Sequence, residues 1–220
     1  MIYQDDIRAC NAYAQRDADA LNRSALFVLA TIQQLLETVP VALTDMVERG
    51  VLSRFAWGHK AKGVEYLAAH NAEFYRAAIA ARDDPVELLH VFLHVPGFAL
   101  VKAGFLCQIF AGSVGCIDLH NVKIYGVSIG DVRYRLECKP ATLAKKRVQY
   151  VALCESLGGA APLWSRWCDY VATLRPKNWA DGAEVSKFHI DVITGLETGA
   201  IVDLFTDVEY EPTFRQELKS

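Results

Sequence analysis

The turn that organises this chain reads HVPGFALVKAGF, residues 94–105, and apolar helical patterns lie on both sides of it. The Pro96-Gly97 pair ends one helix and permits a tight turn before the next. Helices joined in this way present backbone N–H groups at a helix amino terminus, where the partial positive charge suits a phosphate. The stretch predicts either a phosphate-binding helical hairpin or an ordinary antiparallel helix corner. In the first case the binding residues are Pro96, Gly97, Phe98 and Ala99.

Helical periodicity continues over most of the chain. Apolar residues at three- and four-residue spacing over 25–36 follow Ser24, a residue type that caps helices, and Pro40 ends the pattern. Residues 122–127 are rich in β-branched side chains but too few to seed a sheet. The sequence therefore predicts an all-α fold. Further helices are predicted at 43–49, 60–81, 85–93, 99–111, 141–157 and 163–174, with a weaker pattern over 183–205.

Length and composition indicate a globular protein. The 220 residues fit one large domain or two packed lobes, and 52% are hydrophobic while 22% are charged. No apolar run reaches the roughly 18 residues that would span a bilayer, and the first ten residues lack the regions of a secretion signal. We expect a cytoplasmic protein with no membrane partner. No C-x-x-C pair occurs among the six cysteines at 10, 107, 116, 138, 154 and 168, so reduced thiols and no metal are expected.

The charge balance limits how the protein can bind nucleic acid. A net charge of -3 gives no overall positive field, so phosphate contacts need a local excess of lysine and arginine. One such excess lies at residues 133–147, where six basic side chains accompany Glu137. This stretch predicts either a local nucleic-acid contact or an ordinary solvated helix face.

A second informative stretch, GCIDLHNVKIYG, covers residues 115–126. It places Asp118 in an apolar setting, directly after a helix and two residues before His120. A carboxylate in such a setting is costly unless it is paired or used in chemistry. Asp118 is therefore either a catalytic group or a structural helix cap.

Together the two stretches resemble the helix-hairpin-helix DNA glycosylase superfamily, in which an L-P-G-V-G-x-K-T-A turn precedes V-D-T-H-x-x-R. The resemblance extends over about residues 58–126, because a short G-x-x-x-K-A stretch of the family resembles Gly58-His59-Lys60-Ala61. The remainder of the chain is compatible only in length and helix content. The residues that match the turn and the aspartate segment are Pro96, Gly97, Ala103, Ile117, Asp118, His120 and Lys123.

The resemblance implies a single all-helical unit over residues 1–220, built of two lobes with the active site between them. The helix-hairpin-helix and the catalytic loop would occupy about residues 85–126. It also implies DNA as the partner, with the target nucleotide rotated out of the stack. Asp118 would be the essential carboxylate, His120 would mainly orient the loop, and Lys102 and Lys123 would face phosphate. The implied catalytic set is Asp118, His120 and Lys102.

Departures from the family pattern restrict the activity. Val101 stands where bifunctional glycosylases carry a Schiff-base lysine, and Lys102 follows about 100° further around the helix. Lyase activity is therefore not expected. Ala99 replaces the second glycine of the hairpin. No four-cysteine cluster follows, so no iron–sulfur cofactor, nor any other cofactor, is expected.

Three functions remain open at this point. The first is a monofunctional DNA N-glycosylase in which Asp118 assists attack of water at the sugar. The second, favoured by Val101, the small size and the absent cluster, resembles phage enzymes that join an amino acid or polyamine to an activated 5-hydroxymethyl pyrimidine in DNA. Such an enzyme would work in the host cytoplasm. The third is a DNA-binding protein without catalysis. Weaker site candidates are Gln33, Gln34, Trp164, Trp167, Trp179, His189 and Asp191.

Overall fold

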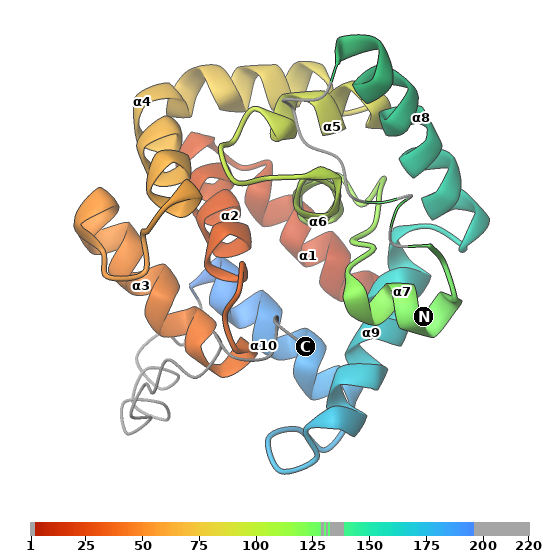
Figure 1. Ribbon diagram of the computed structural model, residues 1–220. Coiled ribbons are helices and arrows are strands. Elements are labelled where there is room, and N and C mark those ends of the chain that lie inside the picture. The colour runs from red at the N-terminus through yellow and green to blue at the C-terminus, as the bar shows by residue number, and fades with distance from the viewer. Residues whose placement is uncertain (1–2, 129, 131, 133–138, 196–220) are drawn as a thin grey trace, which may run out of the picture.

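The structure is a computed structural model that describes residues 3–128, 130, 132 and 139–195. Within these residues every regular element is a helix, which confirms the predicted all-α class (Figure 1). The first half contains α1 (Gln4–Ala14), α2 (Ala18–Ala30), η1 (Leu36–Thr38), α3 (Val39–Arg49), η2 (Gly50–Leu52) and α4 (His59–Ala80). The second half contains α5 (Pro85–Leu93), α6 (Leu100–Phe110), α7 (Leu119–Tyr125), α8 (Pro140–Ser156), α9 (Ala160–Leu174) and α10 (Gly182–Thr194).

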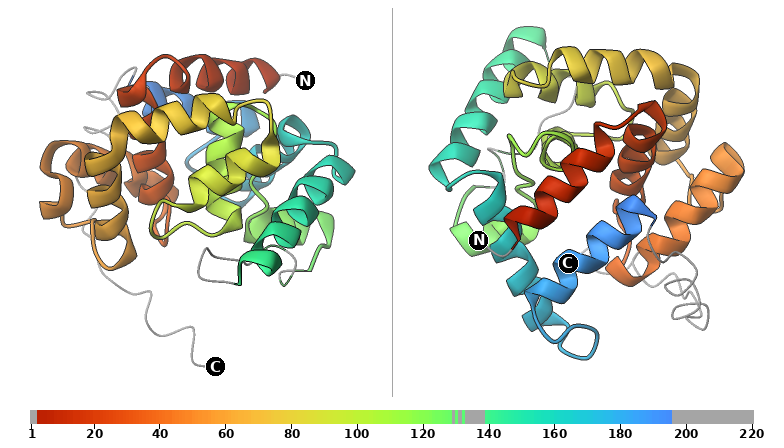
Figure 2. Two further views of the ribbon diagram at one scale, coloured as in Figure 1. Left: turned by 90° about the horizontal axis from the view of Figure 1, so that it is seen from above. Right: turned by 180° about the vertical axis from the view of Figure 1, so that it is seen from behind.

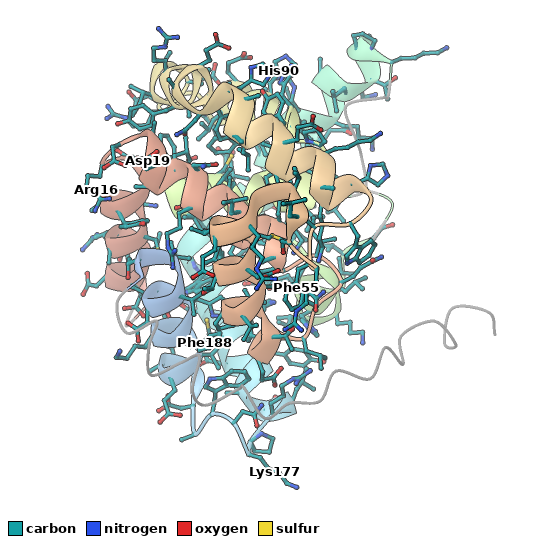
Figure 3. All side chains as sticks on the ribbon, turned by 90° about the vertical axis from the view of Figure 1, so that its left-hand side faces the viewer. Arg16, Asp19, Phe55, His90, Lys177 and Phe188 are labelled. Carbon is teal, nitrogen blue, oxygen red and sulfur yellow. The ribbon has the colours of Figure 1, made fainter. Side chains whose placement is uncertain are left out.

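Helix α6 is the centre of the core, and Figure 1 looks along its axis. It is apolar around almost its whole circumference, as expected of a helix enclosed by others. Helices α1, α2 and α5 pack directly against it. Helices α1 and α10 cover the face that points away from the viewer in Figure 1 and toward the viewer in the right-hand view of Figure 2. Figure 3 shows His90 on α5 and Lys177, between α9 and α10, at opposite ends.

The turn between α5 and α6 packs on the amino-terminal part of α4. Gly97 has φ +94°, a conformation that favours glycine, and a Cβ there would lie 3.4 Å from the carbonyl oxygen of His59. Gly63 allows the second close approach, since a Cβ at this position would lie 2.7 Å from the carbonyl oxygen of Pro96. The two predicted helices and the turn between them are therefore present, and the turn is held against α4.

Several predicted boundaries are wrong. Ser24 is inside α2 and donates to the carbonyl of Ala20, while the N-cap is Asp17, whose carboxylate accepts from the backbone N–H of Ala20. Pro40 does not end the preceding helix but lies in the first turn of α3. Proline is tolerated there because the backbone N–H groups of a first turn make no hydrogen bond within the helix. Residues 122–125, which include the β-branched Val122 and Ile124, belong to α7. Asp118 caps that helix, and this local start outweighs the weak strand propensity.

Some predictions fall partly outside the described residues. The basic stretch is described only from residue 139 onward, and there Arg147 lies 3.5 Å from Glu87 and donates to the carbonyl of Val86. The C-terminal helical pattern is described as α10 up to Thr194, and 196–205 lie outside. Among the described helices, none is both long enough and apolar enough to cross a membrane.

Candidate functional site

A cavity of about 540 Å³ lies beside α6 and brings together side chains from both halves of the chain. Its walls come from the segment after α2, from α6, from the loop that leads into α7, and from α9 and α10. The polar groups that face it include Lys102, Asp118, His120, Arg175 and His189. The volume falls in the range of small-molecule sites, roughly 300–1,000 Å³. The three predicted catalytic residues Asp118, His120 and Lys102 thus share one cavity.

Asp118 is held by three hydrogen bonds. It is the N-cap of α7, and its Oδ1 accepts from the backbone N–H groups of His120 and Asn121, both at 3.0 Å. Its Oδ2 accepts from the indole Nε1 of Trp167 at 2.8 Å. A carboxylate has about four acceptor positions, so these bonds fix its orientation and leave capacity for one more donor. The cap role and a chemical role are therefore compatible in this geometry.

Buried side chains hold the loop that carries Asp118. The hydroxyl of Tyr150, which is fully buried, donates to the carbonyl of Gly115 and accepts from the N–H of Ile117, both at 3.0 Å. Gln108 accepts from the N–H of Cys116. The amide of Asn121 donates to the carbonyl of Cys116 at 2.7 Å. The position of Asp118 is therefore set by the core as well as by its own cap.

Replacing Tyr150 by phenylalanine tests this support. Loss of the hydroxyl leaves the buried N–H of Ile117 without a partner and leaves the carbonyl of Gly115 with only the weak donor Sγ of Cys154, 3.6 Å away. We expect the free energy of unfolding to fall by about 1–3 kcal/mol. Urea unfolding provides the measurement. Tyr75→Phe is the matched control, because the Tyr75 hydroxyl makes a single bond, to the carbonyl of Gln15, away from the cavity. Equal losses in the two variants would show that Tyr150 does not support the loop in this way.

Lys102 enters the cavity from α6. Its ammonium donates to the hydroxyl of Thr31 at 2.8 Å and lies 5.7 Å from the ring centroid of Phe105. Val101 instead packs against the hydrophobic core. The cavity wall therefore contains a lysine amine, one position after the residue at which the resemblance places the family's lysine.

Two stacked tryptophans form an aromatic wall. The rings of Trp164 and Trp167 lie 5.7 Å apart at an interplanar angle of 15°. Trp164 is 6% exposed and donates to the hydroxyl of Ser186, whereas Trp167 is half-buried and donates to Asp118. His120 lies beside this wall, 6.3 Å from the ring of Trp167. Core packing and lining of the site are thus combined in one ring pair.

His189 is a buried histidine on the same wall. Its Nδ1 lies 2.7 Å from the carbonyl of Val185, so this nitrogen donates and Nε2 is the acceptor of the neutral ring. Burial, followed by the neighbouring charge of Lys102, lowers the pKa of His189 to about 4 against the opposing bond to Val185. His189 therefore presents a neutral imidazole to the cavity at neutral pH.

The lowered pKa of His189 predicts a pH dependence of stability. An unfolded histidine binds a proton near pH 6.5 and the folded one only near pH 4, so the unfolded state takes up the proton between these values. The stability that the neutral His189 contributes above pH 6.5 is therefore lost as the pH falls through this window. The loss in the free energy of unfolding is about 3 kcal/mol at most. Urea unfolding between pH 7 and 4 should show a shallower decline for His189→Gln than for the wild type.

Arg175 was not predicted from the sequence. It follows α9 and faces the cavity, and its guanidinium is paired with Glu37 of η1, which also accepts from Asn178 at 2.6 Å. Arg175 and Asn178 are 138 and 141 residues away from Glu37 along the chain. No local pattern around Arg175 indicates such a contact, and only the fold brings the groups together.

Other predicted residues lie elsewhere. Lys123 is exposed on α7 and does not line the cavity. Asp191 pairs with Lys187 on the surface of α10. Trp179 is buried against Phe188, with ring centroids 5.8 Å apart. Phe98 is 3% exposed, so its side chain belongs to the core and only its backbone is suited to bind a ligand.

The described cysteines are free thiols, as predicted, and Cys138 lies outside the described residues. Burial is the main cause that raises the pKa of Cys116, the thiol that lines the cavity, and the carboxylate of Asp118 adds to it. Cys116 is therefore a packing residue and not a nucleophile.

Comparisons of the chain with protein families, with curated proteins and with solved structures find no match. The fold and the site define an all-helical protein with a partly polar, aromatic-walled cavity.

Proposed function

We propose that the protein is a DNA-modifying transferase that joins an amino acid or amine to an activated 5-hydroxymethyl pyrimidine. Its motifs resemble the helix-hairpin-helix DNA glycosylase superfamily, whose phage branch contains enzymes of this kind. The observation that carries the proposal is the shared cavity of Asp118, Lys102 and Arg175. A flipped pyrimidine that carries a pyrophosphate needs cations for the leaving group and a carboxylate for the incoming amine. Removal of a neutral base needs no cation at this place.

The residues have distinct parts in this reaction. The amine nitrogen forms a bond to the exocyclic methylene carbon, and the bond from this carbon to the pyrophosphate oxygen breaks. Pyrophosphate leaves with the electron pair, and the nitrogen releases one proton to the carboxylate of Asp118. Asp118 orients and activates the amine, whereas Lys102 and Arg175 stabilise the charge on the leaving group. The paired rings of Trp164 and Trp167 provide an apolar wall for the pyrimidine.

DNA binding in this proposal uses the turn between α5 and α6. Gly97 and Ala99 bring the backbone close to the surface, and α6 begins directly after them. Backbone N–H groups at a helix amino terminus suit a phosphate. The flipped nucleotide would then reach the cavity from the same side of α6 as Lys102.

A monofunctional DNA N-glycosylase is the second candidate, favoured by the fixed orientation of Asp118. An anionic carboxylate held by a cap and by the Trp167 indole suits stabilisation of positive charge at a sugar carbon. In that case His189, neutral on the same wall, would accept a hydrogen bond from the base. The two functions share the cavity and differ in the bond that breaks.

Mass spectrometry of nucleosides distinguishes them. The full chain is incubated with DNA that contains pyrophosphoryl-hydroxymethyl-uracil and with a mixture of amino acids and polyamines. A heavier intact nucleoside supports transfer, and a released base supports excision. If neither product forms while the DNA is bound, the protein is a non-catalytic binder and the proposal is wrong.

A further inference from the structure

A second, smaller cavity of about 200 Å³ lies on the other side of the segment that follows α2. Ile32 and Gln33 face this second cavity, whereas Gln34 and the next two residues face the main one. The remaining walls come from the amino-terminal end of α4 and from Gly97 in the turn before α6. The second cavity thus lies next to the main cavity and directly at the turn.

Lys60 is the unusual group in the second cavity. The residue is 2% exposed, and within the described part of the chain its buried Nζ has no hydrogen-bond acceptor. The ammonium lies 5.3 Å from the ring centroid of Trp57, an aromatic contact that compensates little of the lost hydration. Burial, and then the charge of Lys102, lower the pKa of Lys60 to about 8. A buried amine without an acceptor is costly, and such a group is retained where it serves a ligand.

The electrostatic surroundings specify the sign of that ligand. No carboxylate is among the described residues that line the second cavity. Lys60 lies in the first turn of the 22-residue α4, whose amino end adds partial positive charge. The nearby Lys102 adds to the same field. An anion complements every one of these groups.

We propose that the second cavity binds a phosphodiester group of the DNA strand, with Lys60 as its direct ligand and Trp57 as a stacking surface at the rim. Trp57 is 49% exposed although it is a large aromatic residue, so its outer face is open to a sugar or base. The proposal rests on DNA being the substrate, as proposed above. It adds Lys60, a residue outside the turn, to the phosphate contacts. The bound phosphate would be separated from the flipped nucleotide by the segment that follows α2.

Fluorescence anisotropy with a labelled duplex, measured from 50 to 300 mM NaCl, tests the proposal with the full chain. Lys60→Met should weaken binding about tenfold at the lower salt and reduce the slope of log Kd against log salt by about one. Lys62→Met is the matched control on the exposed face of α4 and should leave the slope unchanged. Trp57→Ala, which changes an exposed side chain, should weaken binding at all salt concentrations.

Thermal unfolding provides a control for the fold, because Lys60→Met removes an unpaired buried charge and should leave the melting temperature equal or higher. Equal affinity and slope for the wild type and Lys60→Met would overturn the second-cavity proposal, even if the wild type modifies DNA. Inorganic phosphate provides an independent probe through the NMR signal of the Lys60 side chain. A shift on adding phosphate, with no DNA binding, would support an anion site and reject DNA as its source together with the proposed function. No shift and no change in slope would reject the site itself.

Discussion

Asp118→Asn will reduce turnover on pyrophosphoryl-hydroxymethyl-uracil DNA by about 10²–10⁴-fold, the range for loss of a positioned charged group. The asparagine oxygen can still accept from the N–H groups of His120 and Asn121, so the cap of α7 is retained. Its amide then faces the N–H of Trp167, and two opposed donors will cost about 1–2 kcal/mol of stability. The loss of activity should therefore far exceed any loss of fold. Nucleoside mass spectrometry gives the turnover and urea unfolding gives the stability.

The control for Asp118→Asn is the same substitution at another capping aspartate. Asp181 accepts from the N–H groups of Ala183 and Glu184 at the start of α10 and is not part of the cavity. Asp181→Asn should retain turnover within about twofold, because the cap geometry persists. Full activity of Asp118→Asn would show that Asp118 is only a cap, and both catalytic functions would then be rejected.

The front of the site was predictable because its residues are close in sequence. Asp118 and His120 follow a helix within one short stretch, and Lys102 lies in the helix just before it. The apolar setting of Asp118 indicates chemistry by itself, whereas His120 and Lys102 are implied as site residues by the family resemblance. The part of the cavity wall formed by Trp167 and Arg175 could not be predicted in this way. Trp167 contacts Asp118 from 49 residues away, and Arg175 contacts Glu37 from 138 residues away. Contacts at such separations depend on how the helices pack, which periodicity alone does not specify.

Helix boundaries show the same limit at a smaller scale. The apolar pattern that starts at residue 25 predicts Ser24 as the N-cap, whereas the observed N-cap is Asp17, which is also a residue type that caps helices. The helix starts at Ala18 because the carboxylate of Asp17 accepts from the N–H of Ala20, and Ser24 is buried inside the helix. Rotation around a helix is similarly a matter of packing. Val101 and Lys102 are about 100° apart around α6, and in the structure Val101 packs against the core while Lys102 faces the cavity.

Lys102→Met will reduce turnover on the pyrophosphorylated substrate by about 10²–10³-fold, because the charge that stabilises the leaving pyrophosphate is lost. The methionine side chain can replace the lysine stem beside Phe105, and Thr31 still donates to the carbonyl of Val28, so the fold should persist. Lys102→Arg should recover part of the activity. Lys62→Met, an exposed lysine replaced in the same way, should retain it.

The behaviour of Lys102 also decides what kind of amine the cavity contains. Its ammonium donates to Thr31, a geometry that suits a charge-stabilising group more than a nucleophile. We therefore expect no covalent adduct when the protein is treated with borohydride in the presence of abasic DNA. An adduct that forms in the wild type and disappears in Lys102→Met would identify Lys102 as an imine-forming nucleophile. The cavity would then be that of a glycosylase with lyase activity, and the role of Lys102 in stabilising a leaving group would be rejected.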